Sequence, residues 1–395
     1  MEVTELGDAA AGRRTVSIAG AGIAGLTVGA LLAKRGWGVT IYERGSGIRE
    51  IGAGIVVHNN MALVFEELGV FDRLLRGAEQ FEWERLCDRH GKVLRQKNLA
   101  GSARRYNPLR QSLVSGLYSA AVELGAKIVT GAEVVSATEG GEICLADGTS
   151  RRSDLVIAAD GFRSAVRSSL GLTVKAVSLS NGATRVLIPR GEFEAEPVVW
   201  EFWSGSRRLG IAPTTADQTY VYLACPQSDR RGCALPIDGD YWQSAFPTLP
   251  ADLFKRLAAA SGTRNAYPFV QCRAWSKGRV AIIGDAAHAL PPTLGQGAGL
   301  AVSNARALVG ALDATSDMRA ALEKWEAQYR GVTELTQRWA RRYDAMSTAL
   351  ARVPSARAVV IRLFRVPWLD RRLHAADRVT FGVATPSPAP PVPRK

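Results

Sequence analysis

The sequence predicts an α/β protein in which a nucleotide-binding domain is divided by an inserted mixed β-sheet. Two glycine-rich segments, at 20–25 and 284–299, each follow an apolar strand and precede a helix rich in alanine and leucine. Between them, residues 198–203 and 219–223 carry the aromatic and β-branched residues that favour strands. The chain of 395 residues is long enough for one large domain and a smaller one.

The amino-terminal segment has the pattern of a phosphate-binding turn. Residues 15–19 form a short β-branched strand, and the glycines that follow fit G-x-G-x-x-G before a helical stretch. In such a turn the first glycine allows the tight bend, the second lets a pyrophosphate approach the backbone, and the third allows close helix–strand packing. N–H groups at the start of the helix favour the phosphate anions. The expected dinucleotide-binding residues of this turn are Gly20, Gly22, Ile23, Ala24 and Gly25.

An acidic residue follows at the distance typical of this arrangement. A second strand, residues 38–43, ends in Glu43, which lies 18 residues after Gly25. A carboxylate near this spacing binds a ribose hydroxyl. The order of strand, glycine motif, helix, strand and acid therefore predicts a Rossmann-like domain. The acid disfavours a 2′-phosphate on this nucleotide but leaves both NAD and FAD open.

Two further strand ends carry an aspartate. Asp160 follows the apolar residues 155–159 and precedes a helix start, and by itself it is equally compatible with a simple helix cap. Asp285 follows the strand at 279–284. An aspartate at a strand end so far downstream of a G-x-G-x-x-G turn is typical of FAD binding. The first motif then takes the ADP half of FAD, and the second takes the ribityl chain.

Together, these motifs resemble the class A FAD-dependent aromatic monooxygenases of the para-hydroxybenzoate and salicylate hydroxylase type, across roughly residues 13–350. The resemblance implies a Rossmann-like FAD-binding domain of the GR2 type, with an inserted mixed β-sheet substrate domain and C-terminal helices. It also implies that Asp285 binds a ribityl hydroxyl, and that Asp160 helps FAD and the nicotinamide cofactor to engage. The other cofactor-binding positions that it implies are Arg44, Ala53, Gly54, Arg110, Gly284, Gly297, Ala298 and Gly299.

One branch of this family is more similar than the rest. Many members carry an acid in the helix after the Gly-Gln-Gly loop, where this chain has Ser303-Asn304-Ala305. The segment 295–308 resembles that of ring-opening pyridine oxygenases such as 2-methyl-3-hydroxypyridine-5-carboxylate oxygenase. The likeness implies that Arg208 and Tyr220 contact the substrate, with Trp83 in the same pocket. It also implies that Pro292 faces the isoalloxazine ring. A surface arginine beside Arg207 is the alternative for Arg208.

The resemblance implies a reaction as well as a site. NADH or NADPH would reduce FAD, and O2 would be captured as a flavin C4a-hydroperoxide that transfers one oxygen atom to a small hydroxylated aromatic or N-heteroaromatic acid. Water must be kept out because it would release hydrogen peroxide instead. Ring opening and simple hydroxylation of a salicylate-like or polycyclic substrate both remain open. A non-oxygenating flavoprotein, such as a redox sensor, is the alternative from a different class.

Composition narrows the partners. The longest apolar runs are far shorter than the roughly 18 residues of a membrane span, and no signal peptide is recognisable. The five cysteines and four histidines have no metal-binding spacing, which predicts free thiols, no metal and a cytoplasmic protein. A monomer and a homo-oligomer both remain open. Residues 338–395 hold 12 Lys/Arg and 3 Asp/Glu, hence +9 of the net charge of +13. No nucleic-acid-recognition motif accompanies this charge.

The expected organisation is as follows. Helices are expected at residues 59–68, 110–124, 298–313 and 317–350. Residues 1–172 and 273–350 are expected to form the two parts of the FAD-binding domain, and 173–272 the substrate-binding sheet domain. Residues 351–384 are expected to be a C-terminal helical segment. Residues 385–395 are proline-rich, which predicts a disordered tail.

Overall fold

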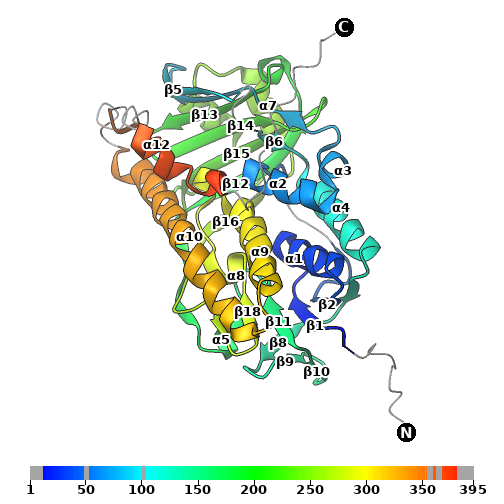
Figure 1. The fold of residues 1–395 in the computed structure, drawn as a ribbon. Coiled ribbons are helices and arrows are strands. Elements are labelled where there is room, and N and C mark those ends of the chain that lie inside the picture. Colours follow the sequence, from blue (N-terminus) through cyan, green and yellow to red (C-terminus); the bar gives the residue numbers. More distant parts are fainter. Residues whose placement is uncertain are drawn as a thin grey trace.

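A computed structural model describes residues 12–48, 53–99, 104–351, 353, 359–361 and 367–379. Two β-sheets lie one above the other, and helices pack around and between them (Figure 1). The predicted mixed α/β fold class is confirmed. The expected proline-rich tail, 385–395, lies outside the described residues, and so do parts of the expected helical segment 351–384.

The first sheet contains six strands in the order β17-β18-β11-β1-β2-β7. Its strands pair in parallel except for β17, which is antiparallel to β18. Their bounds are β1 (Thr15–Ala19), β2 (Gly38–Glu43), β7 (Lys127–Thr130), β11 (Leu155–Ala158), β17 (Ser276–Lys277) and β18 (Val280–Ile282). The central strands are apolar at nearly every position because both faces of a parallel sheet are covered.

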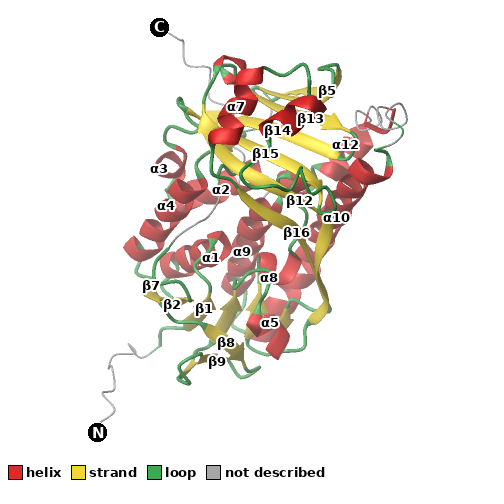
Figure 2. Cartoon of the chain, turned by 180° about the vertical axis from the view of Figure 1, so that it is seen from behind, coloured by secondary structure: helices red, strands yellow, loops and turns green. Residues whose placement is uncertain are grey.

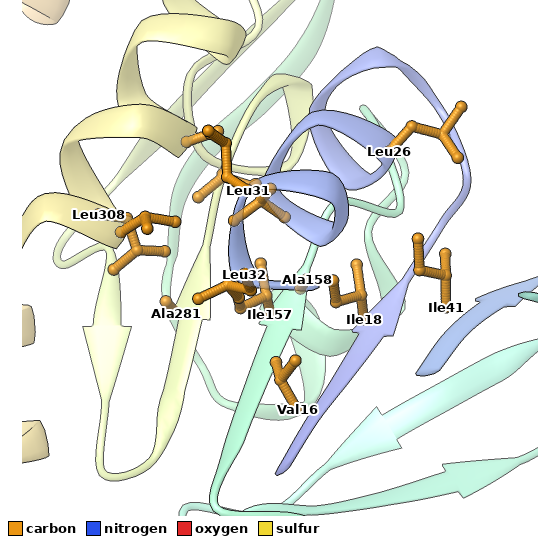
Figure 3. Packing of buried hydrophobic residues seen from close by; sticks show 14 of the residues in the cluster. Val16, Ile18, Leu26, Leu31, Leu32, Ile41, Ile157, Ala158, Ala281 and Leu308 are labelled. Atoms are coloured by element: carbon orange, nitrogen blue, oxygen red, sulfur yellow. The ribbon is translucent and has the colours of Figure 1, made fainter. Parts of the chain in front are cut away.

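Helices α1 (Ile23–Lys34), α4 (Arg110–Glu123) and α9 (Gly297–Asp313) cover this sheet, and α1 contacts both α4 and α9. Figure 3 shows the resulting core, where Leu31 of α1 and Leu308 of α9 lie in one cluster with Ile18 and Ile157 from the strands. This core joins the two glycine-rich motifs, which are far apart in the sequence. A small sheet of order β10-β9-β8 lies beside α5. The bounds are β8 (Val134–Ala137), β9 (Glu142–Leu145), β10 (Ser150–Arg152) and α5 (Ala165–Ser169).

The second sheet contains seven strands in the order β16-β12-β15-β14-β13-β4-β5. Besides strands from residues 173–272, it includes β4 and β5 from the amino-terminal part of the chain, and β4 pairs in parallel with β13. The bounds are β4 (Trp83–Asp88), β5 (Val93–Asn98), β12 (Thr173–Pro189), β13 (Val198–Ser204), β14 (Arg207–Pro213), β15 (Gln218–Pro226) and β16 (Thr263–Cys272). A two-stranded sheet pairs β3 (Glu79–Gln80) with β6 (Tyr106–Asn107).

The two faces of the seven-stranded sheet differ. Helices α6 (Gly239–Ala245) and α7 (Ala251–Ala259) cover one face around a core that includes Phe202 and Trp242 (Figure 2). The opposite face turns toward the six-stranded sheet and its helices. Polar and aromatic residues are half-buried there, among them Tyr220 and Tyr222.

The long helix α10 (Met318–Ala349) runs along both halves of the molecule (Figure 1). It packs on α9 at one end and brings Tyr343 against Trp203 of the second sheet at the other. The remaining elements are α2 (Asn59–Leu68), α3 (Phe71–Leu75), η1 (Glu192–Glu194), α8 (Asp285–His288), η2 (Pro292–Leu294), α12 (Pro367–Leu373) and η3 (Ala376–Arg378). Among the described residues, no helix is long and apolar enough to cross a membrane, and no group of His, Cys, Asp and Glu side chains could hold a metal ion.

Candidate active site

The glycines of the first motif have different surroundings. Gly20 has φ +96°, and an added Cβ would lie 2.5 Å from the carbonyl oxygen of Ala159. A Cβ on Gly25 would lie 2.0 Å from the carbonyl oxygen of Gly20. At Gly22, by contrast, an added Cβ meets no described atom within 4 Å. Two glycines therefore serve close packing, while the one at the amino end of α1 leaves its backbone open for a pyrophosphate.

Glu43, at the end of β2, holds the turn in place. Its Oε2 accepts a hydrogen bond from the N–H of Ala21 at 2.9 Å, and its Oε1 accepts one from the N–H of Gly45 at 2.8 Å. The carboxylate lines a cavity of about 320 Å³, together with Gly22 and the side chains of Arg44 and Arg163. The open N–H groups, the two cations and the acid match the pyrophosphate and ribose of the ADP half of FAD.

Asp160 lines the same cavity and also caps a helix. Its Oδ2 accepts a hydrogen bond from the N–H of Val166 at 3.3 Å, at the start of α5. Its buried Oδ1 has no hydrogen-bond partner among the described residues, and burial raises the pKa of this carboxyl group. The structure therefore supports the helix cap and places Asp160 at the wall of the ADP cavity.

The second glycine-rich segment meets the first at the start of α1. Gly284 has φ +60°, and an added Cβ would lie 2.9 Å from the Cβ of Ala24. Asp285 begins α8 and is exposed. Gly297, Ala298 and Gly299 form the first turn of α9, so their N–H groups lie at its positive end. The α1–α9 contact thus places both motifs around one continuous site.

A third segment closes the site toward the second sheet. Gly54 forms a β-bridge with Leu109, and the N–H of Arg110 donates to the carbonyl oxygen of Ala53 at 2.9 Å. A Cβ on Gly54 would lie 2.6 Å from Asn107 Oδ1 and 2.9 Å from the Cβ of Tyr220. Ala53, Gly54 and Arg110 are therefore brought to the boundary with Tyr220. Pro292 begins η2 and is exposed near the first turn of α9.

The predicted substrate residues are placed differently from one another. Tyr220 is half-buried on the sheet face toward the FAD site; burial raises the pKa of its hydroxyl, and the nearby cation of Arg185 opposes this. Trp83 of β4 pairs with Val198 of β13. Two residues further along, Arg85 pairs with Trp200, and its guanidinium lies over the Trp200 ring. Because side chains alternate along a strand, this register directs Trp83 to the opposite face of the sheet. The structure therefore does not bring Trp83 to Tyr220.

Arg208 lies in a buried ion-pair cluster. Its side chain is 3% exposed, and its guanidinium nitrogens lie 3.3 Å from Asp344 Oδ1 and 3.7 Å from Glu201 Oε1. Trp203 and Tyr343 pack around the same guanidinium. The interpretation of Arg208 as a surface arginine is wrong, since its neighbour Arg207, not Arg208, forms the more exposed ion pair. Two carboxylates already balance the charge of Arg208.

Two interactions near the loop Gly295–Gly299 were not expected from the sequence. His288 is buried, and its Nε2 lies 2.9 Å from Nδ2 of Asn304. His58, Gln296 and Asp377 form a second group. The sequence offers no signal for the second group, because its members come from three distant segments.

Known proteins that are similar in sequence agree with this site. A model of the FAD binding domain family matches residues 13–333. The chain is 34% identical over 333 residues to a probable 2-heptyl-3-hydroxy-4(1H)-quinolone synthase of Rhodococcus erythropolis, covering 82% of this chain and 86% of that one. It is 36% identical over 327 residues to a 2-heptyl-3-hydroxy-4(1H)-quinolone synthase of Mycobacteroides abscessus, covering 81% and 87%.

Solved structures agree. A tetrameric form of 2-methyl-3-hydroxypyridine-5-carboxylic acid oxygenase has a TM-score of 0.81 and 29% identity, covering 93% of this chain and 96% of the other. HpxO of Klebsiella pneumoniae, complexed with FAD and uric acid, shares the fold with a TM-score of 0.79 at 24% identity, over 92% and 97%. The family match, the relatives and the site geometry lead to one conclusion: the chain belongs to the FAD binding domain family of class A aromatic hydroxylases and is an FAD-dependent monooxygenase.

Proposed function

We propose that the protein uses NADH or NADPH and O2 to hydroxylate a neutral, bicyclic N-heteroaromatic ring of the 4(1H)-quinolone type. The observation that carries this proposal is that the buried Arg208 already forms ion pairs with two carboxylates. A cation that pairs with Glu201 and Asp344 has little charge left to attract a substrate carboxylate. The substrate then needs no negative charge of its own.

The rest of the sheet face supports a flat aromatic substrate. Leu187, Val199, Tyr220 and Tyr222 are half-buried on this face, and the ring of Tyr222 lies directly over Gly210, where an added Cβ would meet it at 1.9 Å. Aromatic and aliphatic side chains of this kind stack on ring systems and keep water away. Relatives of both organisms carry the name quinolone synthase, which agrees with a substrate of this shape.

The residues of the chain have distinct roles in this reaction. When bound, FAD supplies the redox and oxygen-activating chemistry. The N–H groups of Gly297, Ala298 and Gly299 stabilise negative charge at the first turn of α9. The aromatic and aliphatic side chains on the sheet face exclude water, which favours oxygen transfer over loss of hydrogen peroxide. The Tyr220 hydroxyl, with the Arg185 cation nearby, orients polar groups of the substrate.

A second candidate is ring opening of a hydroxypyridine carboxylic acid. Arg185 favours it, because this half-buried cation lies beside Tyr220 and could pair with a substrate carboxylate. The likeness to 2-methyl-3-hydroxypyridine-5-carboxylic acid oxygenase supports the same candidate. The two candidates differ in the charge of the substrate and in the fate of the ring.

The test presents the FAD-loaded protein with a 2-alkyl-4(1H)-quinolone and with a 3-hydroxypyridine carboxylic acid, each with NADH and with NADPH. Hydroxylation predicts substrate-stimulated oxidation of the nicotinamide and a quinolone product that is one oxygen atom heavier and retains its aromatic absorption. If the pyridine acid instead yields a product that has gained one oxygen atom and one water and has lost its aromatic absorption, ring opening is established.

Arg185→Gln separates the candidates further. It should raise the KM for an acid strongly and change the KM for a neutral quinolone little, because only the acid needs the cation. If neither compound stimulates nicotinamide oxidation in a protein that retains FAD, both substrate proposals are rejected.

A further inference from the structure

His58, Gln296 and Asp377 meet in a buried cluster behind the flavin loop, Gly295–Gly299. The Nε2 of Gln296 donates to Asp377 Oδ1 at 2.6 Å, and the Nδ1 of His58 lies 2.9 Å from the same oxygen. His58 directly precedes α2, Gln296 directly precedes α9, and Asp377 lies in η3. A single carboxylate oxygen of Asp377 therefore links the carboxyl-terminal part of the chain to both His58 and Gln296.

The charges of this cluster are defined by its partners. Arg105, which is 7% exposed, donates to the second oxygen of Asp377 at 2.9 Å and to Glu84 at 3.1 Å. Burial alone would raise the pKa of Asp377, but the hydrogen bond with His58 and the charge of Arg105 lower it well below its usual range. Burial lowers the pKa of His58, although Asp377 opposes this. The arrangement is an ionised Asp377, held by Arg105, beside a neutral His58.

An acceptor at Nδ1 determines where the His58 proton lies. With Asp377 accepting there, the proton is on Nδ1, and Nε2 carries a lone pair. This Nε2 is buried and has no hydrogen-bond partner among the described residues, and a Cβ on Gly295 would lie 3.0 Å from it. Gln296 Oε1 likewise lies against Gly299, where a Cβ would approach it to 2.9 Å. Both side chains thus pack directly on the flavin loop.

We propose that Asp377 is a positioning residue of the flavin site: it orients His58 and Gln296, and through them it fixes the flavin loop and the N–H groups at the start of α9. The proposal rests on FAD binding by this family and not on the identity of the substrate. It makes the carboxyl-terminal turn η3, which lies beyond the region matched by the family model, a part of the cofactor site.

The primary variant is Asp377→Ala, with Asp370→Ala as its matched control. Asp370 lies in α12 of the same carboxyl-terminal segment and pairs with Arg95 at 2.8 Å and with Lys97 at 3.6 Å, at the surface of the second sheet. Losing one charge-assisted hydrogen bond in the cluster should weaken FAD binding about tenfold, or about 1.4 kcal/mol, in Asp377→Ala. The visible absorption spectrum of the bound flavin should also shift. Asp370→Ala should leave both unchanged, even if the two variants lower the unfolding temperature equally.

Gln296→Met provides a second route to the same link and retains the length of the side chain. If Asp377 acts in part through Gln296, adding Gln296→Met to Asp377→Ala should weaken FAD binding little further, because Asp377→Ala has already removed the partner of Gln296. Should Asp377→Ala fail to fold, the comparison of Gln296→Met with Asp370→Ala decides the matter. Additive effects, or equal effects of Asp377→Ala and Asp370→Ala on FAD binding and on the spectrum, would overturn the proposal.

A measurement without FAD tests the geometry directly. Nitrogen-15 NMR of the FAD-free protein at neutral pH should show the His58 proton on Nδ1. A proton on Nε2, or a doubly protonated ring, would overturn the proposed arrangement.

Discussion

Gly22 and Gly25 belong to one motif, but substitutions at Gly22 should affect cofactor binding and substitutions at Gly25 should affect folding. Side chains added at Gly22 meet open space, whereas those at Gly25 meet the backbone of Gly20. The residue scale therefore offers variants that fail for different physical reasons.

Gly22→Val should fold and yet bind no FAD, since the new side chain occupies the space that the pyrophosphate needs. Gly25→Val should instead destabilise the fold itself, because no rearrangement of a side chain can relieve a clash with backbone. Thermal unfolding of FAD-free protein and flavin content after purification distinguish the two. A yellow, FAD-loaded Gly22→Val protein would contradict the assignment of this turn.

Asp285 should matter to the cofactor more than to the fold, because it is exposed at the start of α8. Losing its hydrogen bond to a ribityl hydroxyl should weaken FAD binding by about 1.5–3 kcal/mol in Asp285→Ala, the usual scale for a charged partner. Fluorescence titration of FAD measures this change, with Asp285→Asn as the conservative comparison. An unchanged dissociation constant would remove Asp285 from the site.

At the scale of elements, His288 of α8 and Asn304 of α9 form a neutral buried pair. Their ring and amide nitrogens lie 2.9 Å apart, and Trp325 donates to the carbonyl oxygen of Asn304 at 3.1 Å. An acid at position 304 would charge this pair. An amide instead leaves His288 uncharged, so α8 and α9 pack without a buried ion.

This pairing predicts a defined pH dependence. Burial lowers the pKa of His288 to about 4, below the ordinary value of 6.5. The unfolded chain therefore binds a proton between these values that the native protein does not, and stability falls as pH falls from 6.5 to 4. His288 should contribute on the order of 3 kcal/mol to this fall. His288→Gln should lose that share of the pH dependence, as measured by chemical denaturation at several pH values; parallel profiles would contradict it.

At the scale of the whole molecule, Arg208 joins the second sheet to α10. Asp344, its partner on α10, also accepts a hydrogen bond from Asn181 of β12 at 3.1 Å. The long helix α10 is thereby fixed to the second sheet.

Arg208→Ala should destabilise the protein by about 3–5 kcal/mol, because it leaves two buried carboxylates unpaired. Arg207→Ala is the control on the same strand, since the Arg207 side chain is 29% exposed and its ion pair is worth at most about 1 kcal/mol. Free energies of unfolding from urea titration compare them. A stable Arg208→Ala protein with only a raised KM would return Arg208 to the role of a substrate residue.

The local parts of the fold were predicted closely. The strands expected at residues 15–19 and 38–43 are β1 and β2, and the helix expected at 59–68 is α2. Helices expected at 110–124 and 298–313 differ from α4 and α9 by one residue at one end. Such elements follow from periodicity and turn chemistry within a few neighbouring residues, which a single sequence displays.

By itself, then, the sequence indicated FAD binding through two glycine-rich motifs, because each motif is a local strand–turn–helix pattern. The tertiary structure alone decided the pairing of β4 with β13, the face on which Trp83 lies, and the partners of Arg208. It also decided the contact of Asp377 with His58 and Gln296. These depend on strand register and on packing between segments that are distant in the sequence. A shift of one residue in register exchanges the two faces of a strand, and no local pattern encodes that choice.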